Sequence, residues 1–271
     1  MRHRFENVTG FLLAGGASRR MGQPKAGLML GGETMLSRQI RLLGAVSRQV
    51  FVVLGRKEKG DRRQETEARE KVESGVRSQE SRVRKEATRE WQATKKGNSR
   101  EREMSEALLL TPDSSLLSPS SDGSSLLIPS SILADELPNR GPLAGIATAL
   151  ASTRTEFNLI VGCDLPSVEA LFLRFLCRRA IQGGADVTLP VSQGGTDEPL
   201  CAVYHRRALR PIRTALAAGQ NKVTRWFRKA RVERIMWREI ALAGFPAHLF
   251  DNMNTLVDYE AAQRRFSAGC R

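Results

Sequence analysis

Two adjacent glycines followed by three cations form the stretch of this sequence with the clearest chemical potential, which reads GGASRRMGQPK over residues 15–25. Gly15 and Gly16 carry no Cβ, so their backbone can take positive φ and turn N–H groups toward an anion. Mobile positive charge comes from Arg19, Arg20 and Lys25. Many donors and several charges together suit the polyphosphate of a nucleoside triphosphate. The stretch therefore predicts a nucleotide-phosphate site.

The spacing of these glycines excludes two better-known phosphate loops. Residues 15–25 contain no G-x-x-x-x-G-K-[ST] pattern, so they do not form a P-loop. Glycines at 15, 16 and 22 also fail to make G-x-G-x-x-G, the dinucleotide-binding fingerprint. The predicted phosphate site is therefore of another kind.

A second candidate for chemistry is Asp164, which follows an apolar run at 157–163. A carboxylate just past the carboxyl end of a central parallel strand lies where open α/β sheets bind ligands. Mg²⁺ prefers carboxylate and phosphate oxygens, with water completing its coordination. The alternative role, capping a helix that begins near Ser167, would suffice for an isolated aspartate. Together with the glycine-rich stretch, Asp164 is better interpreted as a magnesium ligand.

The elements that must position these residues follow from the apolar pattern. Short apolar runs at 8–13, 50–54 and 157–163 predict buried strands, and a stripe over 33–46 predicts a helix. Strand, helix and strand in this order are typical of a parallel βαβ unit. Further helices are expected at 143–150, 170–181, 208–218 and 256–266, and further strands at 186–190 and 199–204. We therefore expect an α/β, Rossmann-like three-layer fold with a central, mostly parallel sheet.

A long insertion interrupts this pattern. Residues 57–130 are first rich in charge and then in Ser and Pro, with too few apolar side chains to offset the entropy of ordering. We expect the segment to be mostly disordered, because surface loops tolerate added length at little cost. The alternative is a docking arm for a partner. Residues 1–56 and 131–271 would then form a single domain.

Composition narrows the class of protein. The chain has 271 residues and a formal net charge of +14. Residues 56–106 contain 16 basic and 12 acidic residues, so the rest of the chain carries most of this charge. No apolar run is long enough for a membrane span, and the N-terminus lacks the apolar region of a signal peptide, so we expect a cytoplasmic protein without a membrane partner. The four cysteines lack C-x-x-C spacing and are interpreted as reduced thiols. Basic residues are not interleaved with aromatics, so we do not expect a nucleic-acid partner.

The string L-A-G-G-x-S-x-R-M-G-x-x-K at 13–25 resembles the signature of molybdenum cofactor guanylyltransferases. The resemblance covers nearly all of the chain outside the insertion. It implies the nucleotide-diphospho-sugar transferase type of fold. It also implies transfer of GMP from GTP to molybdopterin with release of pyrophosphate, Mg²⁺ as cofactor, and other proteins of molybdenum cofactor biosynthesis as partners.

Site residues are carried over from this resemblance position by position. The resemblance implies a catalytic group of Arg20, Lys25 and Asp164. In this group Asp164 is also expected to hold the metal. The residues expected to contact nucleotide are Leu13, Ala14, Gly15, Gly16, Lys25, Asp135 and Asp164. Asn252 and Asn254, in N-x-N-T, are expected beside molybdopterin, and the stretch at 197–200, DEPL, also resembles the family. One departure is Val53, where family members can carry an asparagine.

Two other classes of function stay open at this point. The predicted phosphate loop says little about which nucleotide base is bound. The residues therefore support equally a CTP-dependent molybdopterin cytidylyltransferase or a sugar- or polyol-phosphate nucleotidyltransferase. A non-catalytic, basic nucleotide- or RNA-binding module would also explain the charge. The presence of Lys25, Asp135 and Asp164 together argues against this last reading.

Overall fold

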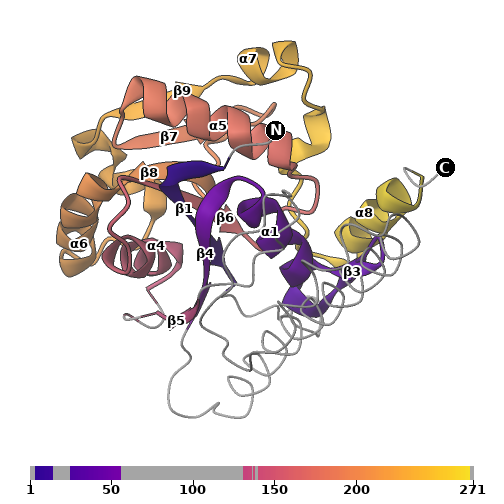
Figure 1. Ribbon diagram of the computed structural model, residues 1–271, viewed down its shortest axis with the longest axis horizontal. Coiled ribbons are helices and arrows are strands. Elements are labelled where there is room, and N and C mark those ends of the chain that lie inside the picture. Colours follow the sequence, from indigo (N-terminus) through magenta and orange to yellow (C-terminus); the bar gives the residue numbers. More distant parts are fainter. Residues whose placement is uncertain (1–3, 15–24, 56–130, 136, 138–139, 269–271) are drawn as a thin grey trace, which may run out of the picture.

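The computed structural model describes residues 4–14, 25–55, 131–135, 137 and 140–268 (Figure 1). Three predicted site residues, Gly15, Gly16 and Arg20, lie outside the described residues. The predicted insertion at 57–130 lies outside them as well.

A seven-stranded sheet forms the centre of the fold, in the order β5-β4-β1-β6-β8-β7-β9. Its strands are β1 (Phe5–Leu13), β4 (Ser47–Leu54), β5 (Ser131–Ala134), β6 (Phe157–Gly162), β7 (Val187–Pro190), β8 (Cys201–His205) and β9 (Val232–Ile235). Among these strands only β8 runs antiparallel to its neighbours. The expected mostly parallel sheet is confirmed. A small hairpin, β2 (Met29–Leu30) with β3 (Glu33–Thr34), lies outside this sheet.

Helices cover both faces of the sheet. The α-helices are α1 (Met35–Gly44), α4 (Pro142–Ala151), α5 (Ala170–Gly183), α6 (Leu209–Ala217), α7 (Trp237–Leu242) and α8 (Leu256–Ala268). Short 3-10 turns are η1 (Lys25–Gly27), η2 (Arg206–Ala208), η3 (Val223–Lys229) and η4 (Ala247–Phe250). In Figure 1, α1 and α5 lie on one side of the strands and α4 and α6 on the other. The expected three-layer arrangement is confirmed.

Strand β1 shows why the layers form. Its side chains alternate between the two faces, as strand geometry requires. Val8 and Leu12 pack in the apolar cluster that contains α1 and α5, whereas Phe11 and Leu13 pack in the cluster that contains α4 and α6. All four are buried. The apolar run therefore supplies both halves of the core from one central strand.

Among the described elements, β5, β9 and α7 were not expected from the sequence. Strands β5 and β9 are four residues each and lie at the two edges of the sheet. The residues of β9 read Val-Glu-Arg-Ile, which lacks the alternation of apolar and polar side chains that marks a strand. The first two residues of the predicted 33–46 helix instead form β3, and Thr34 caps α1 by accepting from the Ser37 N–H. Edge strands depend on neighbours in the sheet that a local pattern does not reveal.

The cysteines and the lengths of the helices were also addressed by the sequence. Cys163, Cys177 and Cys201 are free thiols, as expected. Burial raises the pKa of Cys177 to about 12, which keeps that thiol protonated and unreactive. None of the described helices combines the length and apolar character that crossing a bilayer requires.

At Gly10, β1 lies close to Leu43 of α1 and Ser47 of β4. A Cβ on Gly10 would lie 2.6 Å from the Ser47 Oγ and 3.2 Å from a methyl carbon of Leu43. The Ser47 hydroxyl is itself fixed, because it donates to the Leu43 carbonyl at 2.8 Å. The central strand can therefore lie at this distance only with a glycine at this position.

Gly10→Ala should lower the free energy of unfolding by about 1–3 kcal/mol, because the added methyl overpacks a closed site. Urea denaturation measures the change. Gly194→Ala is the matched control, since a Cβ there meets nothing within 4 Å. In a Ser47→Ala background, which removes the clashing oxygen, Gly10→Ala should cost less. An equal cost in both backgrounds would contradict this explanation.

Candidate active site

Three predicted site positions lie at the same edge of the sheet, where β1, β5 and β6 end. Ala14 follows β1 and donates its N–H to the Val53 carbonyl at 2.9 Å. Asp135 follows β5 and donates its N–H to the Leu54 carbonyl at 2.9 Å. Asp164 lies two residues after β6. Because these strands are parallel, their carboxyl ends make one edge, which is the usual ligand site of an open α/β sheet.

Lys25 joins two segments at this edge. Its ammonium donates to the Asn254 Oδ1 at 2.6 Å and lies 3.7 Å from the Asp164 Oδ2. The Lys25 and Asp164 side chains keep 15% and 27% of their surface exposed, so a ligand can reach them. The structure thus brings together three of the predicted site residues. A cation between two oxygen-bearing side chains is suited to a phosphate or a phosphate-bound metal.

The position of Asp164 is fixed by its backbone neighbours. Its carbonyl accepts from the Met253 N–H at 2.9 Å, which ties the end of β6 to the segment before α8. Gly162 leaves room for the carboxylate, since a Cβ there would lie 2.8 Å from the Asp164 Oδ1. The Cys163 N–H donates to the Leu13 carbonyl at 3.2 Å. Asp164 is therefore held against both the tip of β1 and the N-x-N segment.

Asp258 positions Asn254, and sequence analysis missed it. Its carboxylate accepts from the backbone N–H groups of Asn254 at 2.8 Å and Thr255 at 2.7 Å. In return the Asp258 N–H donates to the Thr255 Oγ1 at 3.2 Å, so Thr255 caps α8. These hydrogen bonds, led by that from Asn254, hold the pKa of Asp258 below its usual range. The pattern Thr255-x-x-Asp258, a capping-box spacing, was the available signal.

Asp135 lies apart from the Lys25 cluster. It is buried, and its Oδ1 accepts from the Thr148 hydroxyl at 3.2 Å and from the Leu137 N–H at 3.1 Å. Strand β5 is three places from β6 in the sheet, which puts about 14 Å between their ends at the usual strand spacing. A single ligand would have to extend along the sheet edge to meet both.

The remaining predicted residues lie around these two points. Leu13 and Ala14 end β1, between the positions of Asp135 and Asp164. Asn252 is exposed, two residues before Asn254. Val53, where the family can have asparagine, is buried in the apolar cluster beside Gly145. It therefore offers no polar group to a ligand.

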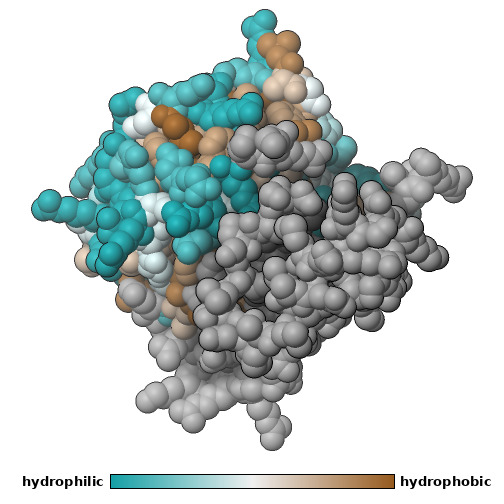
Figure 2. All heavy atoms as spheres, in the orientation of Figure 1, coloured by the Kyte–Doolittle hydropathy of each residue, from teal (hydrophilic) through white to brown (hydrophobic). Residues whose placement is uncertain are grey.

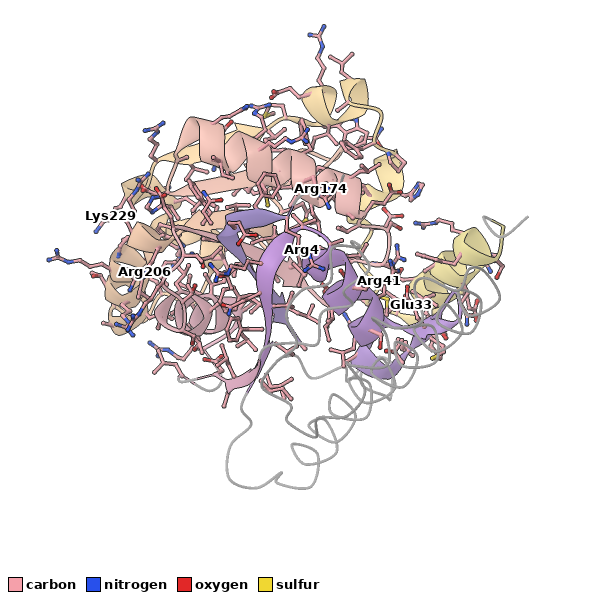
Figure 3. The ribbon with its side chains drawn as sticks, viewed as in Figure 1. Arg4, Glu33, Arg41, Arg174, Arg206 and Lys229 are labelled. Atoms are coloured by element: carbon pink, nitrogen blue, oxygen red, sulfur yellow. The ribbon has the colours of Figure 1, made fainter. Side chains whose placement is uncertain are left out.

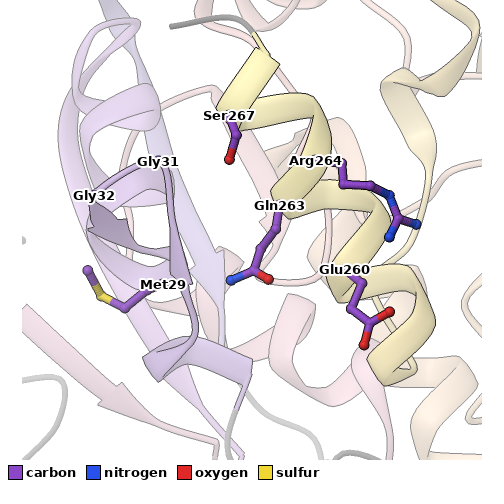
Figure 4. A pocket seen from close by; sticks show the side chains of 7 residues that line it. All are labelled: Met29, Gly31, Gly32, Glu260, Gln263, Arg264 and Ser267. Atoms are coloured by element: carbon purple, nitrogen blue, oxygen red, sulfur yellow. The ribbon is translucent and has the colours of Figure 1, made fainter.

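A hollow of about 680 Å³ lies between the β2–β3 hairpin and α8, the elements that follow Lys25 and Asn254 respectively (Figure 4). Its lining includes Gly31, Gly32, Gln263 and Arg264. In Figure 4 the Gln263 side chain points toward the hairpin. The lining of the hollow includes none of Lys25, Asp164 and Asn254.

Comparison with known proteins places the chain in a family. Residues 10–77 and 103–235, more than half of the chain, match the family described as MobA-like NTP transferase domain. The molybdenum cofactor guanylyltransferase of Desulfosudis oleivorans is 32% identical over 130 residues, which is 48% of this chain and 63% of that protein. A probable molybdenum cofactor guanylyltransferase of Pelotomaculum thermopropionicum is 27% identical over 257 residues, 94% of this chain and 92% of that protein.

The fold has a counterpart among solved structures. The molybdopterin-guanine dinucleotide biosynthesis protein A of Archaeoglobus fulgidus superposes with a TM-score of 0.62 at 18% identity, over 96% of this chain and 99% of that one. At this identity the likeness concerns the fold. The sequence match, the shared architecture and the cluster at the sheet edge agree, and the chain belongs to the MobA-like NTP transferase family.

Proposed function

We propose that this chain transfers GMP from GTP to molybdopterin and releases pyrophosphate. The observation that carries the proposal is the Lys25 ammonium between Asp164 and Asn254 at the carboxyl edge of the sheet. Relatives named molybdenum cofactor guanylyltransferase support the choice of substrates. Other proteins of molybdenum cofactor biosynthesis would supply and receive the cofactor.

In the proposed reaction a phosphate oxygen of molybdopterin attacks the α-phosphorus of GTP. A new P–O bond forms, and the bond between the α-phosphorus and the oxygen that bridges it to the β-phosphorus breaks. The attacking oxygen is already anionic, so no strong general base is needed. The contribution of the protein is alignment of the two substrates and compensation of charge at the α-phosphate.

Each predicted residue has a defined part in this reaction. Lys25 would contact the α-phosphate, because its ammonium is partly exposed and points toward Asp164. Arg20, Gly15 and Gly16 would bind the remaining phosphates, with Leu13 and Ala14 beside the nucleotide. Asp135 would meet the far end of the nucleotide along the sheet edge. Asn252 and Asn254 would lie on the molybdopterin side, with Asn254 held in place by Asp258.

Mg²⁺ fits the oxygen-bearing groups at this point. The Asp164 carboxylate is 27% exposed, and Asn254 brings an amide oxygen to the same ammonium. No group of three or more His, Cys, Asp or Glu within the described ranges could hold a metal alone. That agrees with Mg²⁺, which commonly takes one or two carboxylates and completes its shell with phosphate and water. Bound at Asp164, it would neutralise charge on the reacting phosphate.

Glu198 adds a second carboxylate near this position. Strands β6 and β8 pair Val161 with Cys201, and continuing the register brings Glu198 opposite Asp164. Burial raises the pKa of Glu198 to about 7, a hydrogen bond with Ser192 opposes the rise, and the negative charges of Asp164 and Asp197 add to it. An excess of negative charge in a partly buried site would favour a cation.

Asp164→Asn and Lys25→Ala should both fold and lose transfer. Each change removes a charge that acts on the reacting phosphate, so the rate should fall by about a hundredfold or more. Pyrophosphate release in the presence of GTP, Mg²⁺ and molybdopterin measures the effect. Lys229→Ala is the control, since Lys229 is exposed on η3, remote from this edge. Wild-type turnover in either site variant would remove that residue from the mechanism.

GTP should be the preferred nucleotide in a panel of GTP, CTP and ATP. Calorimetric titration with Mg²⁺ measures binding, and pyrophosphate release with molybdopterin measures transfer. Preference for CTP in both assays would favour the cytidylyltransferase alternative. Turnover with a sugar or polyol phosphate, but not with molybdopterin, would contradict the proposed acceptor.

Glu198 should make the protein less stable as pH rises from about 4.5 to 7. Its pKa is higher in the folded than in the unfolded chain, so the folded state binds the extra proton, and this contribution to stability disappears as pH passes the folded value. Glu198→Gln should therefore gain more free energy of unfolding, relative to wild type, at pH 8 than at pH 5. Urea denaturation in EDTA measures both. Equal gains at the two pH values would refute the assignment.

A further inference from the structure

An arginine-lined hollow lies at the opposite edge of the sheet from the candidate active site. It measures about 670 Å³ and is built by the loop before β6, the end of β8 and the start of α6. We call it the arginine hollow, and its five arginines are Arg154, Arg206, Arg207, Arg210 and Arg213. Figure 3 shows Arg206 on the side of the molecule away from Glu33 and Arg41. Around α6 the visible surface in Figure 2 is mostly hydrophilic.

The lining contains one acid, Glu156, against five arginines. Glu156 lies 3.0 Å from the His205 Nε2, and Asp186 forms an ion pair with Arg207. The other four arginines have no ion pair with any residue in the described part of the chain. Helix α6 itself, LRPIRTALA, contains no acidic residue. The hollow therefore keeps an uncompensated positive charge.

Two of these arginines repel each other along the helix. Arg210 and Arg213 are exposed and three residues apart on α6, where like charges face one another at a cost to the helix. Arg206 and Arg207 lie on η2, immediately before α6. Binding of negative groups to this cluster would relieve the repulsion.

The hollow is separate from the nucleotide site. Arg154 precedes β6, whereas Asp164 follows it. A strand of six residues puts about 20 Å between its two ends. An occupant of the arginine hollow would therefore leave the carboxyl edge free for substrates.

The side chains favour an acidic polypeptide as the occupant. Guanidinium groups form paired hydrogen bonds with carboxylates, and arginine is enriched in protein–protein interfaces. The arginines come from three segments, so they can meet several carboxylates spread along a peptide, and Leu209 adds an apolar contact to the lining. The lining contains no Phe, Tyr or Trp, whereas single-stranded nucleic acids usually stack on such rings.

We propose that the arginine hollow is a docking site for an acidic segment of a partner protein. Four arginines without acidic partners surround a recess large enough for several carboxylates. The site lies away from the reaction, so the partner can remain docked during turnover. This inference does not depend on which nucleotide or acceptor the enzyme uses.

The test compares two triple variants of the full chain for binding to a fluorescent oligoglutamate peptide, measured by anisotropy. Arg206→Gln/Arg210→Gln/Arg213→Gln should weaken binding by about tenfold or more, from the loss of three charge-assisted contacts. Arg48→Gln/Arg178→Gln/Arg238→Gln removes the same charge from exposed arginines elsewhere and should change binding less than about twofold. Both variants should keep the wild-type melting temperature and pyrophosphate release.

Other outcomes would overturn the proposal. Equal loss in both triple variants would mean that net charge alone attracts the peptide. Tighter binding of single-stranded DNA than of oligoglutamate, lost in the first variant only, would assign the hollow to nucleic acid. Complete competition by inorganic phosphate at constant ionic strength would make it a small-anion site.

Discussion

The ammonium of Lys25 is the point on which the geometry of the candidate site depends. It lies at the start of η1, yet it contacts a residue 229 positions later, Asn254, and the carboxylate that follows β6. The contacts join three segments that are far apart in the sequence. A cation is suited to this position because both neighbours present oxygen atoms. Loss of the charge would leave those oxygens facing one another without compensation.

The sheet makes this contact possible by placing strand ends at one edge. Because β1 pairs in parallel with β4 and β6, the residues that follow these three strands lie at the same edge of the sheet. Backbone hydrogen bonds then fix the position of Asp164. The Met253 N–H donates to the Asp164 carbonyl, and the Cys163 N–H donates to the Leu13 carbonyl. Rigid strands thus carry the polar groups, and short connections between main-chain atoms fix their separation. The arrangement is suited to chemistry that depends on alignment more than on proton transfer.

Much of this architecture could be predicted from the sequence, for identifiable reasons. Buried strands such as β1 and β6 are continuous apolar runs, and α1 has a clear apolar stripe, so local pattern is sufficient for them. The meeting of Lys25 and Asp164 followed from the rule that ligands bind at the carboxyl ends of parallel strands. Edge strands β5 and β9 were missed because they are short and only half covered.

The polar details of the site were harder to predict than the strands. The position of Glu198 opposite Asp164 requires the β6–β8 register, which a single sequence does not reveal. The hydrogen bond between Lys25 and Asn254 depends on how the chain returns to the sheet before α8. Asp258 could have been identified from its spacing to Thr255, because a capping pattern is local.

The pairing of β4 with β5 has a consequence for how this gene can change. Residues 51–54 and 131–134 form a parallel ladder, so the chain leaves and re-enters the sheet at two anchored points. Whatever sequence connects those points, lengthening or shortening it does not shift the register of any strand. The connection can therefore change in sequence faster than the strands of the sheet. New binding properties could be acquired there without moving the residues of the candidate active site.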